Sequence, residues 1–117
     1  RHIMTLEECY TSCGGDYQDV LRRLQSENLI RRFLVKFLDD KSYEQLHENL
    51  NNQNYSEAFR AAHTLKGVCQ NLGLGYLSES SIAVTESLRD GKQNVTAEML
   101  KKLDEDYRVT ILAIQSL

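Results

Sequence analysis

Apolar residues recur every three or four positions along most of the 117-residue chain, which is the spacing of amphipathic helices. The pattern predicts two short helices, at 5–12 and after Asp16, and a further helix at 26–39. Longer segments then begin after Gly75, after a Thr96 cap, and at two apparent capping boxes, Ser42-Tyr43-Glu44-Gln45 and Asn54-Tyr55-Ser56-Glu57. Proline is absent, and five of the six glycines lie where the apolar period pauses, so the sequence predicts an all-α protein.

The last four long segments are joined by short loops, and short loops make successive helices antiparallel neighbours. We therefore expect an up-and-down antiparallel four-helix bundle, with the short N-terminal helices covering one end. Residues 4–117 are expected to form a single domain. Arg1-His2-Ile3, ahead of Met4, are expected to be extraneous to the natural chain, and a start at Met4 would suit a free-standing protein.

Charge and composition narrow the class of protein. Fourteen basic against seventeen acidic residues give a net charge of −3. The chain therefore lacks the excess of positive charge that is typical of nucleic-acid-binding domains. The apolar runs are too short to span a bilayer, and no secretory signal opens the chain. Three cysteines form no disulfide framework, so we expect a cytoplasmic domain that binds neither nucleic acid nor membrane.

The segment 54–73 carries an unusual polar face. Its apolar stripe runs through Ala58, Ala62, Leu65 and Cys69, and on a helical wheel His63 lies roughly 140° from the centre of that stripe. Gly67 lies nearly opposite the stripe, one turn beyond His63. On the same side as His63 we expect Arg60 one turn before it and Gln70 two turns after it, whereas Lys66 lies on the boundary of the stripe.

Gly67 is the informative residue of this face. Glycine inside a helix costs about 1 kcal/mol relative to alanine, and Gly67 neither ends the helix nor faces the core. The position indicates that another molecule approaches the backbone beside His63, although a tolerated surface glycine is the alternative. A neutral imidazole is a good nucleophile, and Lys66 can reach the charge of a phosphoryl group on His63.

Ala62-His63-Thr64-Leu65-Lys66-Gly67, followed by Asn71-Leu72-Gly73, resembles the signature of histidine-containing phosphotransfer (HPt) domains. The resemblance implies that His63 accepts the phosphoryl group, that Lys66 is the cation beside it, and that Gly67 is the access gap. It further implies a phosphorelay module without kinase chemistry, nucleotide, cofactor or metal. The implied partners are response-regulator receiver domains, including that of a hybrid sensor kinase, and we expect a monomer.

Related domains commonly support the imidazole with a glutamine on the next helix, and that glutamine is absent here. The hairpin turn centres near Leu74, so His63 is expected to face Thr85, eleven residues beyond the turn. Gln70 and Arg89 are the other candidates for this support. Phe59 is the first candidate for an aromatic residue on a partner surface.

Two other classes of function compete with phosphotransfer. One is an interaction bundle that has the scaffold but carries no phosphate. The other is a metal-binding helical domain that uses histidine with Cys9, Cys13 or Cys69, although Cys69 falls on the core stripe. The acidic run Asp104-Glu105-Asp106 is expected to be solvated.

Overall fold

The computed structural model describes residues 3–117; Arg1 and His2, expected to be extraneous, lie outside the described part of the chain. The described residues form α-helices and no strand, which confirms the predicted all-α class. In chain order these elements are α1 (Leu6–Ser12), α2 (Tyr17–Leu24), α3 (Glu27–Phe37), α4 (Ser42–Asn51), α5 (Tyr55–Leu72), α6 (Gly75–Ser87), the 3₁₀ turn η1 (Arg89–Gly91) and α7 (Ala97–Gln115).

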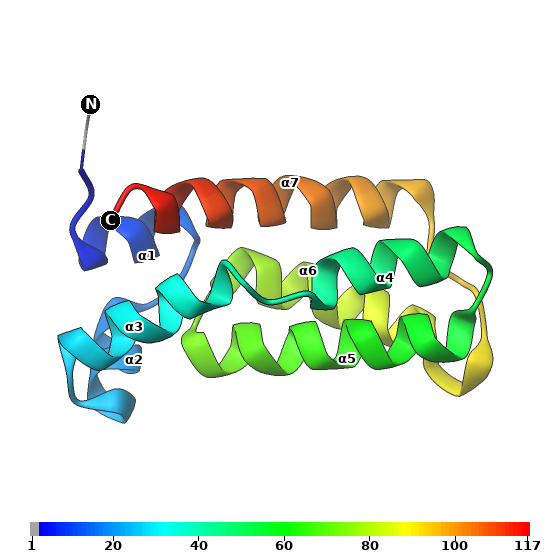
Figure 1. Ribbon diagram of the computed structural model, residues 1–117, viewed down its shortest axis with the longest axis horizontal. Helices are drawn as coiled ribbons and strands as arrows, with labels where there is room; N and C mark the ends of the chain where they lie inside the picture. The colour runs from blue at the N-terminus through cyan, green and yellow to red at the C-terminus, as the bar shows by residue number, and fades with distance from the viewer. Residues whose placement is uncertain (1–2) are drawn as a thin grey trace.

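Helices α4 to α7 pack in chain order, α4 on α5, α5 on α6 and α6 on α7 (Figure 1). Side chains of α4 and α7 also meet. The Tyr43 ring stacks on the Tyr107 ring with centroids 3.7 Å apart, and the Tyr43 hydroxyl donates to Asp104 at 2.6 Å. His47 contacts the same carboxylate at 2.6 Å. These contacts link the first and last of the four helices.

Helix α3 packs against the bundle helices α5 and α7, which the sequence did not predict. Helix α4 has only 10 residues, about 15 Å, and cannot run the length of the 18-residue α5, about 27 Å. Helix α3 lies end to end with α4 and contacts both α5 and α7, so the two together cover the length of α5 (Figure 1). The core accordingly includes the apolar face of α3, namely Ile30, Leu34 and Phe37.

The N-terminal helices lie at the end of the molecule where α5 stops (Figure 1). The Tyr10 hydroxyl of α1 donates to the Leu72 carbonyl at 2.7 Å, which satisfies a carbonyl at the end of α5. Gly15 packs so closely on the backbone of Gly73 that a Cβ at residue 15 would overlap the Gly73 carbonyl oxygen. Gly73 itself ends α5 in the left-handed conformation, with φ 70°.

Two predicted helix starts are confirmed and two predicted capping boxes are wrong. Asp16 and Thr96 cap α2 and α7 through their side chains, as expected. Ser42 is instead the first residue of α4 and is buried, and its backbone N–H donates to the Asp40 carboxylate at 2.8 Å. Asn54 precedes α5 but makes no side-chain capping hydrogen bond. Both segments therefore have the residue types of a capping box but lack the side-chain hydrogen bonds that define one.

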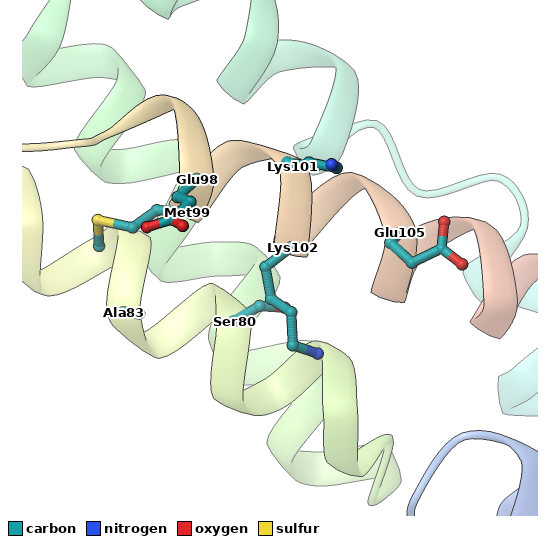
Figure 2. A pocket seen from close by; sticks show the side chains of 7 residues that line it. All are labelled: Ser80, Ala83, Glu98, Met99, Lys101, Lys102 and Glu105. Carbon is teal, nitrogen blue, oxygen red and sulfur yellow. The ribbon is translucent and has the colours of Figure 1, made fainter.

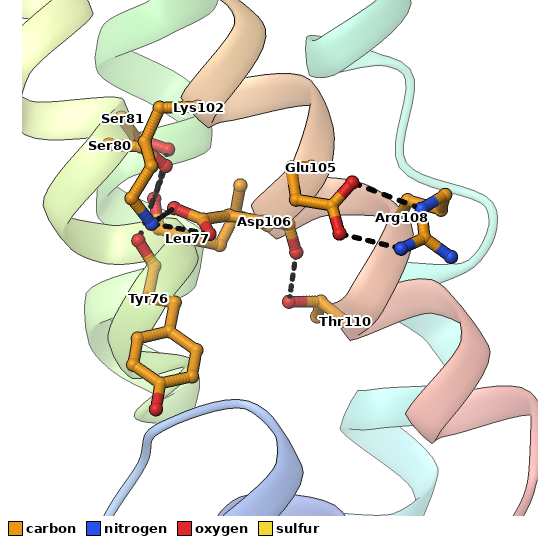
Figure 3. Close-up of polar contacts among 9 residues, drawn as sticks. All are labelled: Tyr76, Leu77, Ser80, Ser81, Lys102, Glu105, Asp106, Arg108 and Thr110. Carbon is orange, nitrogen blue, oxygen red and sulfur yellow. Dashed lines mark hydrogen bonds and ion pairs between the residues drawn. The ribbon is translucent and has the colours of Figure 1, made fainter. Parts of the chain in front are cut away.

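The acidic run on α7 is only partly solvated, which corrects the expectation. Asp106 is 5% exposed because it shares the buried face of α7 with Leu103 and Thr110. The Lys102 ammonium reaches over and donates to both of its carboxylate oxygens, at 2.7 and 2.8 Å (Figure 3). Glu105, one residue earlier, points outward and pairs with Arg108 (Figure 3).

Candidate functional site

His63 lies in the middle of α5 and its side chain is exposed. The helix is oriented by a continuous buried stripe, which consists of Ala58, Ala61, Ala62, Leu65, Cys69 and Leu72. Because this stripe packs into the core, the opposite face of α5 must point outward and carry His63 with it. The exposure expected from the helical wheel is confirmed.

The backbone beside His63 is open. Gly67 is exposed, and a Cβ built on it would meet no atom within 4 Å outside its own helix backbone. Lys66 lies between them in sequence and is half-buried, on the boundary of the stripe as expected. The structure thus gives no internal packing reason for a glycine at residue 67.

An aromatic ring lies beside the imidazole, and a guanidinium lies over that ring. The Phe59 ring lies one turn before His63, with the ring centroids 5.9 Å apart. The Arg89 guanidinium, at the start of η1, lies over the same Phe59 ring at 5.4 Å from its centroid. Two sequence-predicted residues, Phe59 and Arg89, are therefore brought together beside His63.

Glu86 holds the Arg89 side chain in this place. The Arg89 Nε and Nη2 groups donate to the two Glu86 carboxylate oxygens at 3.1 and 2.7 Å. These hydrogen bonds lower the pKa of Glu86, and the charges of Arg89, Lys66 and His63 lower it further. Glu86 is not among the site residues expected from the sequence, although an acidic and a basic residue three positions apart are the signal of such a pair.

Thr85, which the hairpin count placed opposite His63, is fully buried. Its hydroxyl donates to the Ser81 carbonyl of its own helix at 2.7 Å. The expectation that Thr85 supports the imidazole is therefore wrong, because residue 85 faces the core and residue 86 faces outward. Gln70 is exposed on α5, about 10 Å along the helix axis from His63.

Arg60 is exposed one turn before His63, with its guanidinium 3.9 Å from Glu57. This pair adds a second cation to the same face of α5. Two pairs of opposite charge thus lie near His63. Arg60 and Glu57 precede it on α5, and Glu86 and Arg89 belong to α6 and η1.

An apolar groove begins next to the open backbone. It lies between α3 and α5, has a volume of about 250 Å³, and is lined by Phe33, Lys36, Phe37, Asp40, Val68, Asn71 and Leu72. Val68 follows Gly67 directly, and Asn71 lies one turn beyond it. The exposed strip from His63 to Gly67 therefore continues into a groove with phenylalanine rings in its wall.

A second groove lies between α6 and α7 and contains none of the predicted site residues (Figure 2). Its charged side chains are of both signs and come from α7, namely Glu98, Lys101, Lys102 and Glu105. The Ser80 hydroxyl in this groove hydrogen-bonds to carbonyls of its own helix, Tyr76 and Leu77. The groove offers no second cluster around a nucleophile.

The cysteines do not join the histidine site. Cys9, Cys13 and Cys69 are free thiols and all are buried, whereas His63 is exposed. Burial raises the pKa of the Cys69 thiol to about 12. Within residues 3–117, no three histidine, cysteine, aspartate or glutamate side chains converge as a metal site would need.

The fold and this surface define a helical module that displays a histidine between a lysine, an arginine and an open stretch of backbone. A family model described as the Hpt domain matches residues 29–111, which is most of the chain, and the protein belongs to the Hpt domain family. Hpt domains are phosphocarrier modules of phosphorelays and interact with receiver domains. No curated protein and no solved structure matches the chain significantly. No helix in the described residues has the length and apolar character to span a bilayer.

Proposed function

We propose that this protein carries phosphoryl groups on His63, between the phosphoaspartate of one receiver domain and the aspartate of another. The observation that carries the proposal is the exposed imidazole beside an open glycine backbone on α5 of an Hpt domain. The up-and-down arrangement of α4 to α7, with α3 extending α4, would serve as the rigid scaffold. The free, buried cysteines suit a reducing cytoplasm.

The proposed reaction needs only a nucleophile, cations and access. The unprotonated ring nitrogen of His63 attacks phosphorus, a nitrogen–phosphorus bond forms, and the bond from phosphorus to the aspartate oxygen breaks. The carboxylate leaves with the electron pair of that bond. The onward step is the reverse, with the carboxylate of a second receiver as nucleophile. Positioning and charge stabilisation account for catalysis in such transfers.

The neighbours of His63 have separate roles in this proposal. Lys66 stabilises the charge of the phosphoryl group as a point cation. Gly67 leaves room for the loops of the receiver that carry the phosphoaspartate. Phe59 and the groove between α3 and α5 supply apolar contact for the receiver, next to the reacting atoms. The domain itself would have no kinase activity and need no cofactor.

The direct test is the substitution His63→Gln. The side chain is exposed, so the variant should keep its helical circular dichroism and melt within a few degrees of the wild type. A receiver domain carrying labelled phosphate should label the wild type but not the variant. The label should be lost in acid and kept in base, as a phosphohistidine requires. Labelling of the variant at the wild-type level would move the phosphate elsewhere, and no labelling of the wild type would favour the interaction bundle.

A further inference from the structure

The Glu86 carboxylate is linked to the His63 imidazole through two intervening side chains, Arg89 and Phe59. Arg89 is bound to Glu86 through two hydrogen bonds, at 3.1 and 2.7 Å, while its guanidinium lies 5.4 Å from the Phe59 ring centroid. The Phe59 ring in turn lies 5.9 Å from the imidazole. The contacts therefore form a continuous chain from Glu86 through Arg89 and Phe59 to His63.

Both partners of this pair remain free to move. The side chains of Arg89 and Glu86 are 48% and 54% exposed, so neither is fixed by packing. Phe59 holds the guanidinium from one side only, and an exposed ion pair is weak enough to exchange partners. Lys66 and His63 also act on Glu86, because their charges lower the pKa of its carboxyl group.

Building on the proposed function, we propose that Glu86 is a positioning residue that stores the Arg89 guanidinium beside His63 and competes with the phosphoryl group for it. In the unphosphorylated protein, Glu86 and Phe59 hold Arg89 near the imidazole. Phosphorylation brings about two negative charges to the same place, and Arg89 leaves the carboxylate for the phosphoryl oxygens. The carboxylate left behind opposes the new anion, which favours onward transfer.

The competition predicts the lifetime of the phosphohistidine. During hydrolysis water attacks phosphorus, the nitrogen–phosphorus bond breaks, and phosphate leaves the imidazole. A cation held on the phosphoryl oxygens slows this loss, and a nearby carboxylate speeds it. The Glu86→Gln variant should therefore lose its phosphate more slowly than the wild type, by about one-and-a-half- to fivefold, as expected for exposed pairs. The Arg89→Gln variant should lose it faster.

The experiment labels purified protein with phosphoramidate, a small phosphoryl donor, and follows loss of the acid-labile phosphate at pH 8. The variants are Glu86→Gln, Arg89→Gln and the double substitution, and Glu79→Gln is the control. Glu79 is an exposed residue of the same helix, two turns or about 10 Å from Glu86, and its substitution changes the net charge equally. The control should keep the wild-type lifetime.

The double variant distinguishes an effect of Glu86 that passes through Arg89 from direct repulsion between the Glu86 carboxylate and the phosphoryl group. If Glu86 acts through Arg89, the lengthening caused by Glu86→Gln should fall by more than half when Arg89 is already glutamine. The ¹⁵N–¹H signal of the Arg89 side chain should also move when the wild type is phosphorylated. The lifetime difference should shrink in 1 M salt, because both groups are exposed.

Three results would overturn the inference while leaving the proposed function intact. The first is a phosphohistidine lifetime in Glu86→Gln equal to that of the wild type. The second is that Glu86→Gln lengthens the lifetime as much in the Arg89→Gln background as in the wild type. The third is an Arg89 side-chain signal that does not move on phosphorylation. By contrast, a wild type that takes no acid-labile phosphate from either phosphoramidate or a phosphorylated receiver would overturn the proposed function and this inference together.

Discussion

Replacing Gly67 with alanine should make the protein more stable. Residue 67 lies inside α5 and is exposed, and a Cβ there would meet no atom within 4 Å outside the helix backbone. The new methyl group therefore neither clashes nor packs, and only the helix propensity changes. Alanine exceeds glycine by about 0.8–1.0 kcal/mol inside a helix, so the free energy of unfolding should rise by nearly that amount.

Gly15→Ala is the matched control, because the same substitution should have the opposite sign there. A Cβ at residue 15 would overlap the Gly73 carbonyl oxygen, a backbone atom that cannot move aside alone. Overpacking of this kind costs about 1–3 kcal/mol. Urea unfolding followed at 222 nm measures both changes, and Gly67→Ala should also raise Tm by about 3–6 °C.

The functional half of this prediction uses a larger residue. Gly67→Gln should still fold, but its side chain would stand on the open backbone one turn from His63, so transfer from a receiver should slow. Phosphoramidate is small, and labelling by it should change less. A Gly67→Ala protein less stable than the wild type would refute the view of an uncrowded site. A folded Gly67→Gln protein with unchanged receiver transfer would show that the glycine is merely tolerated.

Three other predictions follow from the described contacts. Lys66→Ala should slow transfer without closing access, and the loss should shrink at high salt, where cations are screened; equal losses at 0.05 and 1 M salt would contradict this. Lys102→Ala should lower the free energy of unfolding by about 1–3 kcal/mol because it leaves the buried Asp106 carboxylate unpaired, whereas Lys101→Ala, also exposed, should change it little. Because burial raises the pKa of Cys69 to about 12, its thiol stays uncharged and should resist iodoacetamide at pH 8.5 until urea unfolds the protein; labelling of the native protein would contradict this. The same shift stabilises the fold below about pH 9, where the unfolded thiol begins to ionise, and this contribution is lost as pH rises toward 12.

The exposure of His63 could be predicted because α5 has a regular apolar stripe. Four of its residues, Ala58, Ala62, Leu65 and Cys69, fix the phase of the helix, and all four are fully buried. Once the phase is known, the direction of each polar residue follows from about 100° per position. The apolar stripe stops at Gly73, so the sequence predicts both the exposed face of α5 and the end of this helix.

Helix starts depend on contacts that residue types do not specify. The segment Ser42-Tyr43-Glu44-Gln45 has the composition of a capping box, but the Asp40 carboxylate already accepts the backbone N–H of Ser42. Ser42 is thereby drawn into the first turn, where it is buried. The place of α3 beside α5 also depends on more than its own pattern, because it follows from the shortness of α4.

Thr85 is the wrong residue to expect opposite His63, and the sequence itself contains the reason. His63 and Thr85 each lie eleven residues from the turn at Leu74, so they lie at a similar height along the two helices. This count does not include the rotation of α6 about its own axis. The buried residues Leu77, Ser81, Val84 and Leu88 show that phase, and Thr85 lies among them. One further position turns the side chain by about 100°, which brings Glu86 to the surface beside Arg89. The outward-facing side chain at this level of α6 is therefore a carboxylate bound to the Arg89 guanidinium, and the proposed release of Arg89 rests on this charged pair rather than on a neutral hydroxyl.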